Sequence, residues 1–226
     1  MRKLIYVPVI HTQADMGSMA EPLKKEMIGK FGEAKWREHT NTVDGLWRGT
    51  SRKIKDLRLD YPKLRIYQDG LPVCGKELEI VCEVAGHGSS NYRLILELIK
   101  KGAKIEGTED PKLLIEEYKF IKELTQIADP SEKKRAMKRY QKARDELLRK
   151  RDQFIAQRID ETLRDGDQGL LFVGLEHEID RFLPKHIEVS YLIYRLPFKK
   201  FQRTGLPRPS GTESIKYGSP SIVQKK

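Results

Sequence analysis

The sequence has only two cysteines, Cys74 and Cys82, and they do not form a C-x-x-C motif. A disulfide framework or a cysteine metal site is therefore not predicted, and a reducing, cytoplasmic location is the default expectation. No apolar run approaches the roughly 20 residues that a membrane-spanning helix needs. The apolar run in MRKLIYVPVI is short and leads into HTQAD without a small-residue cleavage site. We expect it to be the first core strand rather than a signal peptide.

Three common catalytic signatures are also missing from the sequence. It contains no G-x-S-x-G elbow, no G-x-x-x-x-G-K-[ST] phosphate loop and no H-E-x-x-H pair. Serine hydrolases, P-loop NTPases and standard zincins are therefore not supported as assignments. With 38% hydrophobic and 34% charged residues, the composition is that of a globular protein with high charge.

The net charge of +11 is unevenly distributed along the chain. Residues Lys133 to Arg158 contain 11 basic and 3 acidic residues, and residues Leu196 to Lys226 contain 7 basic and 1 acidic residue. The basic character therefore belongs to one predicted helix and to the C-terminal end. Both regions are candidates for contact with nucleic acid or another polyanion, although a basic helix face is more often simply solvated.

The order of hydrophobic patterns predicts an α/β fold with a mixed, largely parallel sheet flanked by helices. We assign residues 1–197 to a single α/β domain and residues 198–226 to a basic tail rich in Pro, Gly and Ser. Short apolar segments typical of buried strands are 3–10, 63–68, 78–85, 103–107, 169–174 and 187–196. Helical patterns cover 18–31, 33–58, 89–101, 111–127 and about 131–164.

Polar side chains follow five consecutive predicted strands. In open α/β sheets, ligands bind outside the carboxyl ends of the strands, so these residues are expected at one edge. Imidazole and carboxylate groups are the ligands that Zn, Mn, Co or Fe(II) accept in an open catalytic site. A single histidine after a strand is more often structural, so the residues taken together are stronger evidence for a site than any one of them. The set consists of His11, Asp69, His87, Glu109, Glu176 and His177.

Two neighbouring segments add candidate ligand-binding residues. In AGHGSSNYR, Ser89 or Ser90 is expected to cap a helix, whose free N–H groups are able to hold an anion. Asp15 follows His11 closely, and it is either a partner that fixes the His11 tautomer or a helix cap.

The long predicted helix ends in an apolar stripe that includes a charged residue. Leu148, Ile155 and Ile159 form this stripe, Asp152 lies on it, and Arg151 is beside it. Charges against a core are costly unless they are paired or used. Arg151 and Asp152 are therefore either a structural ion pair or part of the site.

Three segments together resemble the TraB/Tiki-like superfamily, which also includes erythromycin-esterase-like and haem-binding ChaN-like proteins. They are VPVIH, KRDQFIAQRI at 150–159, and VGLEH. In that group a first strand ends in G-x-x-H, a late helix carries an E-R-D-x-x-[ML]-A-like segment, and the next strand ends in a second G-x-x-H. Gly174 to His177 match the second G-x-x-H, whereas Pro8 and Lys150 depart from the pattern.

The resemblance implies two pocket histidines, His11 and His177, and an acidic residue, matched loosely by Asp69 or Glu83. Some members are metal-dependent proteases, some hydrolyse a lactone and some bind haem, so the fold alone does not define the function. We therefore expect a hydrolase of unknown substrate. In one version, His11 and His177, with Asp69 or Glu109, bind a divalent metal or position a water, and Glu176 is the general base. In the other version, His11 and a carboxylate catalyse acid/base hydrolysis without a metal. The alternatives are a polyanion-binding protein, or a pocket that binds haem or a small ligand without turnover.

Overall fold

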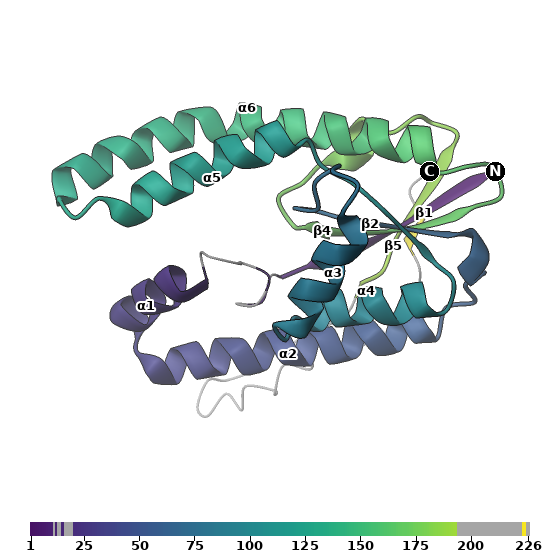
Figure 1. Cartoon of the computed structure of the whole chain (residues 1–226), viewed down its shortest axis with the longest axis horizontal. Helices are drawn as coiled ribbons and strands as arrows, with labels where there is room; N and C mark the ends of the chain where they lie inside the picture. Colours follow the sequence, from purple (N-terminus) through teal and green to yellow (C-terminus); the bar gives the residue numbers. More distant parts are fainter. Residues whose placement is uncertain (11, 13–14, 16–19, 194–222, 225–226) are drawn as a thin grey trace, which may run out of the picture.

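Five parallel strands and one short antiparallel strand form a sheet at the centre of the structure (Figure 1). The computed structural model describes residues 1–10, 12, 15, 20–193 and 223–224. The order of the strands across the sheet is β3-β2-β4-β1-β5-β6, and β6 is antiparallel to β5. Their bounds are β1 (Arg2–Val9), β2 (Leu64–Gln68), β3 (Lys104–Glu106), β4 (Gln168–Gly174), β5 (Ile187–Tyr191) and β6 (Val223–Gln224).

Helices cover both faces of this sheet, as the alternating sequence pattern predicts. The described α-helices are α1 (Ala20–Phe31), α2 (Glu33–Lys55), α3 (Glu77–Gly86), α4 (Ser90–Lys100), α5 (Pro111–Gln126) and α6 (Pro130–Thr162). Short 3-10 turns, η2 (Tyr61–Lys63) and η3 (Ile179–Arg181), precede β2 and β5. The predicted α/β fold with a largely parallel sheet is confirmed.

The sheet separates two hydrophobic cores, because successive side chains of a strand point to opposite faces. In β4, Leu170 and Phe172 face α2, α3 and α4, while Leu171 and Val173 face α6. These four side chains are at most 2% exposed. Figure 1 shows the resulting layers, with α5 lying alongside α6.

The two helices that form this outer layer begin at clear start signals. Asp110 caps α5 by accepting a hydrogen bond from the backbone N–H of Lys112, and Asp129 caps α6 in the same way through Glu132. In both helices a proline follows the cap, where its fixed φ suits the first turn and no N–H is needed. The Asp110 cap fixes where α5 begins, and the Asp129 cap fixes where α6 begins after the turn from α5.

The prediction of a strand over residues 78–85 is wrong, because these residues belong to helix α3. Val81 and Ala85, four residues apart, are buried on one side of the helix, while Leu78 is 49% exposed. The short run of β-branched residues resembled a strand, but packing against α4 buries it at helical spacing. The set of strands that deliver side chains to the edge is therefore smaller than predicted.

The predicted C-terminal tail is described only at Val223 and Gln224, which form β6 beside β5. Among the described residues, no helix is both long enough and apolar enough to span a membrane.

Candidate active site

The segments that follow β1, β2 and β4 meet at the carboxyl edge of the sheet, because β4 lies between the other two strands. The pairing register places Val9 of β1 opposite Gly174 of β4. On the other side of β4, the backbone N–H of Asp69 donates to the Phe172 carbonyl at 2.9 Å. In return, the N–H of Gly174 donates to Oδ2 of Asp69 at 2.7 Å. Hydrogen bonds therefore join the strand ends beyond the sheet itself.

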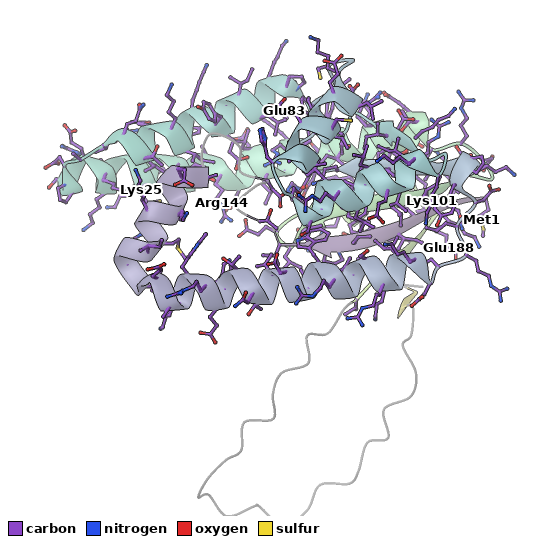
Figure 2. The ribbon with its side chains drawn as sticks, turned by 60° about the horizontal axis from the view of Figure 1, so that its bottom comes forward. Met1, Lys25, Glu83, Lys101, Arg144 and Glu188 are labelled. Carbon is purple, nitrogen blue, oxygen red and sulfur yellow. The ribbon has the colours of Figure 1, made fainter. Side chains whose placement is uncertain are left out.

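A cleft with a volume of about 860 Å³ opens at this edge. Asp69 and His177 line its inner end, and Arg144 lines it from α6. Glu26 of α1 and Lys133 of α6 lie at its outer end, where their charged groups are 3.8 Å apart. The cleft therefore extends from the strand ends to the outer part of α6, where α1 contributes Glu26. Figure 2 shows α1, marked by Lys25, and α6, marked by Arg144.

His177 and Asp152 form a hydrogen-bonded pair at the inner end of the cleft. Nδ1 of His177 lies 2.5 Å from Oδ1 of Asp152, and Oδ2 accepts from the backbone N–H of Glu178 at 2.8 Å. The two side chains are 6% and 3% exposed. Asp152 reaches the pair from the buried stripe of α6, three residues before Ile155. Because the carboxylate accepts the Nδ1 proton, the neutral imidazole carries its lone pair on Nε2.

A chain of buried amides holds Asp69 in place. Nε2 of Gln68 donates to Oδ1 of Asp69 at 2.7 Å, and Nδ2 of Asn91 donates to Oε1 of Gln68 at 2.8 Å. Gln68 and Asn91 are fully buried, and Asp69 is 4% exposed. Both carboxylate oxygens of Asp69 thus accept hydrogen bonds, one of them from Gly174. This arrangement fixes the turn between β4 and His177.

Glu109 and Arg151 form a buried ion pair beside the cleft. Nε and Nη2 of Arg151 donate to the two oxygens of Glu109 at 2.8 and 2.5 Å, and Nη1 donates to Glu117 at 2.6 Å. The backbone N–H of Gly70 also donates to Glu109 at 2.9 Å. Burial disfavours the charged guanidinium, but the hydrogen bonds and charge of Glu109 outweigh it and raise the pKa of Arg151. Glu109, which is fully buried, is thus engaged on both oxygens.

Arg144 and Glu176, the residue before His177, form a more exposed ion pair in the lining of the cleft. Their side chains are 37% and 66% exposed. Arg144 lies seven residues before Arg151 on the same side of α6, so both arginines line the cleft. Glu176, the predicted general base, is therefore held by a guanidinium rather than by a hydrogen bond to His177. An exposed pair of this kind contributes only about 0 to 1 kcal/mol to stability.

Asp15 and Ser89 connect the segment after β1 to the start of α4. Oγ of Ser89 donates to Oδ1 of Asp15, and Oδ2 accepts from the backbone N–H of Thr12 at 2.5 Å. Ser89 also accepts from the backbone N–H of Tyr92 at 3.1 Å, which confirms the predicted helix cap. Ser89 is fully buried, so it positions Asp15, which lines the cleft.

Of the two remaining predicted histidines, only His87 is among the described residues. His11 lies outside the described residues. His87 follows α3 rather than a strand, it is exposed, and it does not line the cleft. His87 therefore does not follow a strand to the carboxyl edge of the sheet, and that prediction is wrong.

The predicted metal site required His11, His177, Asp69 and Glu109. Among the described residues, no group of three or more His, Cys, Asp and Glu side chains is placed to hold a metal ion. Glu109 is bound on both oxygens by Arg151, which leaves His177 and Asp69 as described donors. These residues do not fit a divalent metal by themselves, because an open catalytic site takes about three protein ligands.

The basic residues of α6 are largely paired with acids. Six of the eleven in the Lys133 to Arg158 window form ion pairs with glutamates. Several of these glutamates come from α5, α1 or the segment after β4. The pairs engage groups that a polyanion would otherwise contact, so polyanion binding stays a prediction.

Sequence reasoning missed several side chains that build the site. Glu117 and Tyr140 belong to helix faces that read as solvated, yet the Tyr140 hydroxyl donates to Glu117 at 3.2 Å. Burial, followed by the charge of Glu117, raises the pKa of Tyr140. Gln68 could have pointed to the site from the sequence, because a polar residue at the end of an apolar strand must find buried partners.

Fold and site together define an α/β protein with a largely parallel sheet, whose cleft lies at the carboxyl ends of the strands. In comparisons with known proteins, no family model, no curated protein and no solved structure matches this chain.

Proposed function

We propose that this protein is a hydrolase in which His177 acts as a general base without a metal ion. The pairing of His177 with Asp152 at the inner end of the cleft carries this proposal. A buried carboxylate that accepts the Nδ1 proton keeps the lone pair on Nε2, where a base needs it. Asp152 is a positioning residue, because it acts through the imidazole.

The reaction that fits this arrangement is attack of water on an ester or amide carbonyl. Nε2 of His177 takes a proton from the water as the water oxygen bonds to the carbonyl carbon. The tetrahedral intermediate then collapses, the bond to the leaving group breaks, and His177 returns the proton to the leaving oxygen or nitrogen. The products are a carboxylic acid and an alcohol or amine. Asp152 stays ionised and stabilises the imidazolium that forms between the two steps.

Arg144 is the group that we assign to stabilise the developing oxyanion. It lines the cleft, and its exposed pair with Glu176 can be exchanged for a contact with substrate at little cost. Arg151 is less suited to this role, because Glu109 and Glu117 already occupy its guanidinium.

The test is hydrolysis of a panel of uncharged p-nitrophenyl esters and anilides by the wild type and by His177→Gln. The wild type is expected to hydrolyse at least one member, and the variant to lose about 100-fold or more of kcat, since a general base contributes 10² to 10⁴. His186→Gln is the matched control, because His186 is 62% exposed and does not line the cleft. Equal loss in the control, or full activity in His177→Gln, would contradict the proposal.

A further inference from the structure

The cleft continues well beyond His177, along one side of the two outer helices. On α6 the lining residues recur every three or four positions from Lys133 to Arg151, which is the spacing of a single helix face. At 1.5 Å per residue, this face is about 27 Å long. The cleft is therefore elongated along this helix face.

The outer part of the cleft, distant from His177, forms a channel whose walls are mainly apolar. Apolar side chains from α5 and α6 form them, and two of these, Tyr118 and Met137, are 41% and 39% exposed. Contiguous apolar surface in a cleft is typical of a binding site rather than of ordinary solvent-facing helices. The apolar lining of the outer part consists of Leu114, Tyr118, Ile121, Leu124, Met137 and Leu148.

Hydrogen-bonding capacity distinguishes between two kinds of elongated occupant. The outer walls belong to regular helices, whose backbone N–H and C=O groups are already paired within each helix. An extended peptide would therefore leave its own backbone groups unpaired in an apolar channel, at a cost of about 1 to 3 kcal/mol each. A hydrocarbon chain has no such groups and gains from burial along its whole length.

The charges of the cleft restrict the polar end of the occupant. The lining contains five carboxylates and three basic side chains. Lys133 pairs with Glu26, Arg144 with Glu176, and Arg151 with Glu109 and Glu117. Of these three cations, only Arg144 can readily exchange its partner, and the five carboxylates repel an occupant that already carries a negative charge. An uncharged ester or amide fits better than a free carboxylic acid.

We infer that the substrate is a long-chain aliphatic ester or amide, whose hydrocarbon chain lies along the α5–α6 face while its uncharged carbonyl group lies at His177. This inference rests on the proposed function for the reacting end. The part of the inference that concerns hydrocarbon binding depends only on the apolar channel. The chain is the main source of binding free energy, and the acidic inner end selects for the neutral substrate and releases the anionic product.

The test is binding of an uncharged fluorescent alkyl probe, N-dodecyl dansylamide, below the concentration at which it forms micelles. The full-length wild type is expected to bind it saturably. Primary amides of increasing chain length are expected to displace it, with affinity rising roughly fourfold per added CH₂. Dodecanamide is expected to displace it at a concentration at least tenfold lower than dodecanoate does.

The variant Ile121→Glu places a charge in the channel wall and is expected to weaken probe binding at least tenfold. Ile115→Glu is the matched control, because Ile115 is on the same helix, is 54% exposed and does not line the cleft. Circular dichroism shows whether both variants keep their helices. No saturable binding, equal effects of the two variants, equal displacement by amide and acid, or tighter binding of an uncharged apolar peptide would each overturn the inference.

Probe binding and ester hydrolysis by the wild type separate this inference from the proposed function. Normal probe binding by a wild type that hydrolyses no ester or amide would refute the hydrolase and leave the hydrocarbon site in place. Hydrolysis of p-nitrophenyl acetate, with no faster hydrolysis of p-nitrophenyl decanoate, would support the hydrolase and refute the hydrocarbon site.

Discussion

His177 and Asp152 are joined by a hydrogen bond of 2.5 Å between Nδ1 and Oδ1, across a separation of 25 residues in the sequence. The bond connects the turn after β4 to the middle of the longest helix. The second oxygen of Asp152 accepts the backbone N–H of Glu178, so one carboxylate fixes both the ring and the turn that carries it. This double role explains why an acidic residue is kept on an otherwise apolar stripe.

The exchange Asp152→Asn tests the role of this carboxylate in the tautomer of His177. The amide oxygen is expected to accept from Glu178, so the amide NH₂ faces Nδ1 and moves the imidazole proton to Nε2. A base with its lone pair on the wrong nitrogen cannot take the proton of water, so kcat is expected to fall about 100-fold or more. Nitrogen-15 NMR of His177 measures the tautomer directly, and kinetics on the ester panel measure the loss.

The matched control for this change is Asp145→Asn on the same helix, an exposed acid that does not line the cleft. It is expected to leave both the tautomer and the rate unchanged. An Asp152→Asn protein that keeps the wild-type rate would show that the carboxylate only supports the fold.

Much of the fold could be predicted from the sequence, because burial on a sheet imposes short apolar runs and burial on a helix imposes a stripe. The run at 169–174 and the stripe around Ile155 are clear examples, and both are found as predicted. Residues 78–85 misled because eight apolar-rich residues fit either period when only one face is buried. Their helical form depends on α4, which the local sequence does not show.

The position of the site could be predicted from the sequence, but the contacts within it could not. Parallel strands bring their carboxyl ends to one edge, which places Asp69 and His177 together. Which acid pairs with Arg151 depends on how α5 lies along α6, and Glu117 comes from 34 residues away. Only the packing of these helices could show that Arg151 and Asp152 have separate partners.

The exchange Arg151→Met tests the buried ion pair. It would leave Glu109, which is fully buried, with an uncompensated charge. Breaking a buried pair in this way costs about 3 to 5 kcal/mol of the free energy of unfolding. Urea denaturation followed by circular dichroism measures this loss.

Two further variants define the cause of that loss. Arg144→Met removes an arginine of the exposed pair and is expected to cost less than about 1 kcal/mol. The double variant Arg151→Met/Glu109→Met removes both buried charges and is expected to recover part of the stability lost in the single variant. Equal losses in the two single variants would argue against a special role for the buried pair.

Removal of divalent metal ions is expected to leave the hydrolytic activity unchanged, because His177 and Asp152 supply the base without a metal. The measurement compares the rate before and after dialysis against EDTA, together with elemental analysis of the purified protein. Stoichiometric metal, with activity lost on chelation and restored on its return, would contradict this expectation. It would instead support a metal site that includes His11, His177 and Asp69.

The carboxylate of Glu77 provides a test of how stability depends on pH. Its Oε1 accepts the backbone N–H groups of Cys74 at 2.8 Å and Gly75 at 2.9 Å. Burial acts to raise the pKa of Glu77, but these hydrogen bonds outweigh it and the pKa lies below its usual value. The folded protein thus binds this proton more weakly than the unfolded chain does. The stabilisation is present above the unfolded pKa and is lost as the pH falls through the folded pKa.

Glu77→Gln is therefore expected to lower the free energy of unfolding at pH 7 by about 1 kcal/mol, because a neutral amide accepts these hydrogen bonds less strongly. The difference from the wild type is expected to shrink as the pH falls from the unfolded pKa through the lowered folded pKa, because the wild-type carboxylate then becomes neutral as well. Urea denaturation at several pH values measures this. Glu79→Gln is the control, because Glu79 is 75% exposed and its nearest basic partner is 4.0 Å away. A gap for Glu77→Gln that stays constant across this range would mean that side-chain size, and not charge, is responsible.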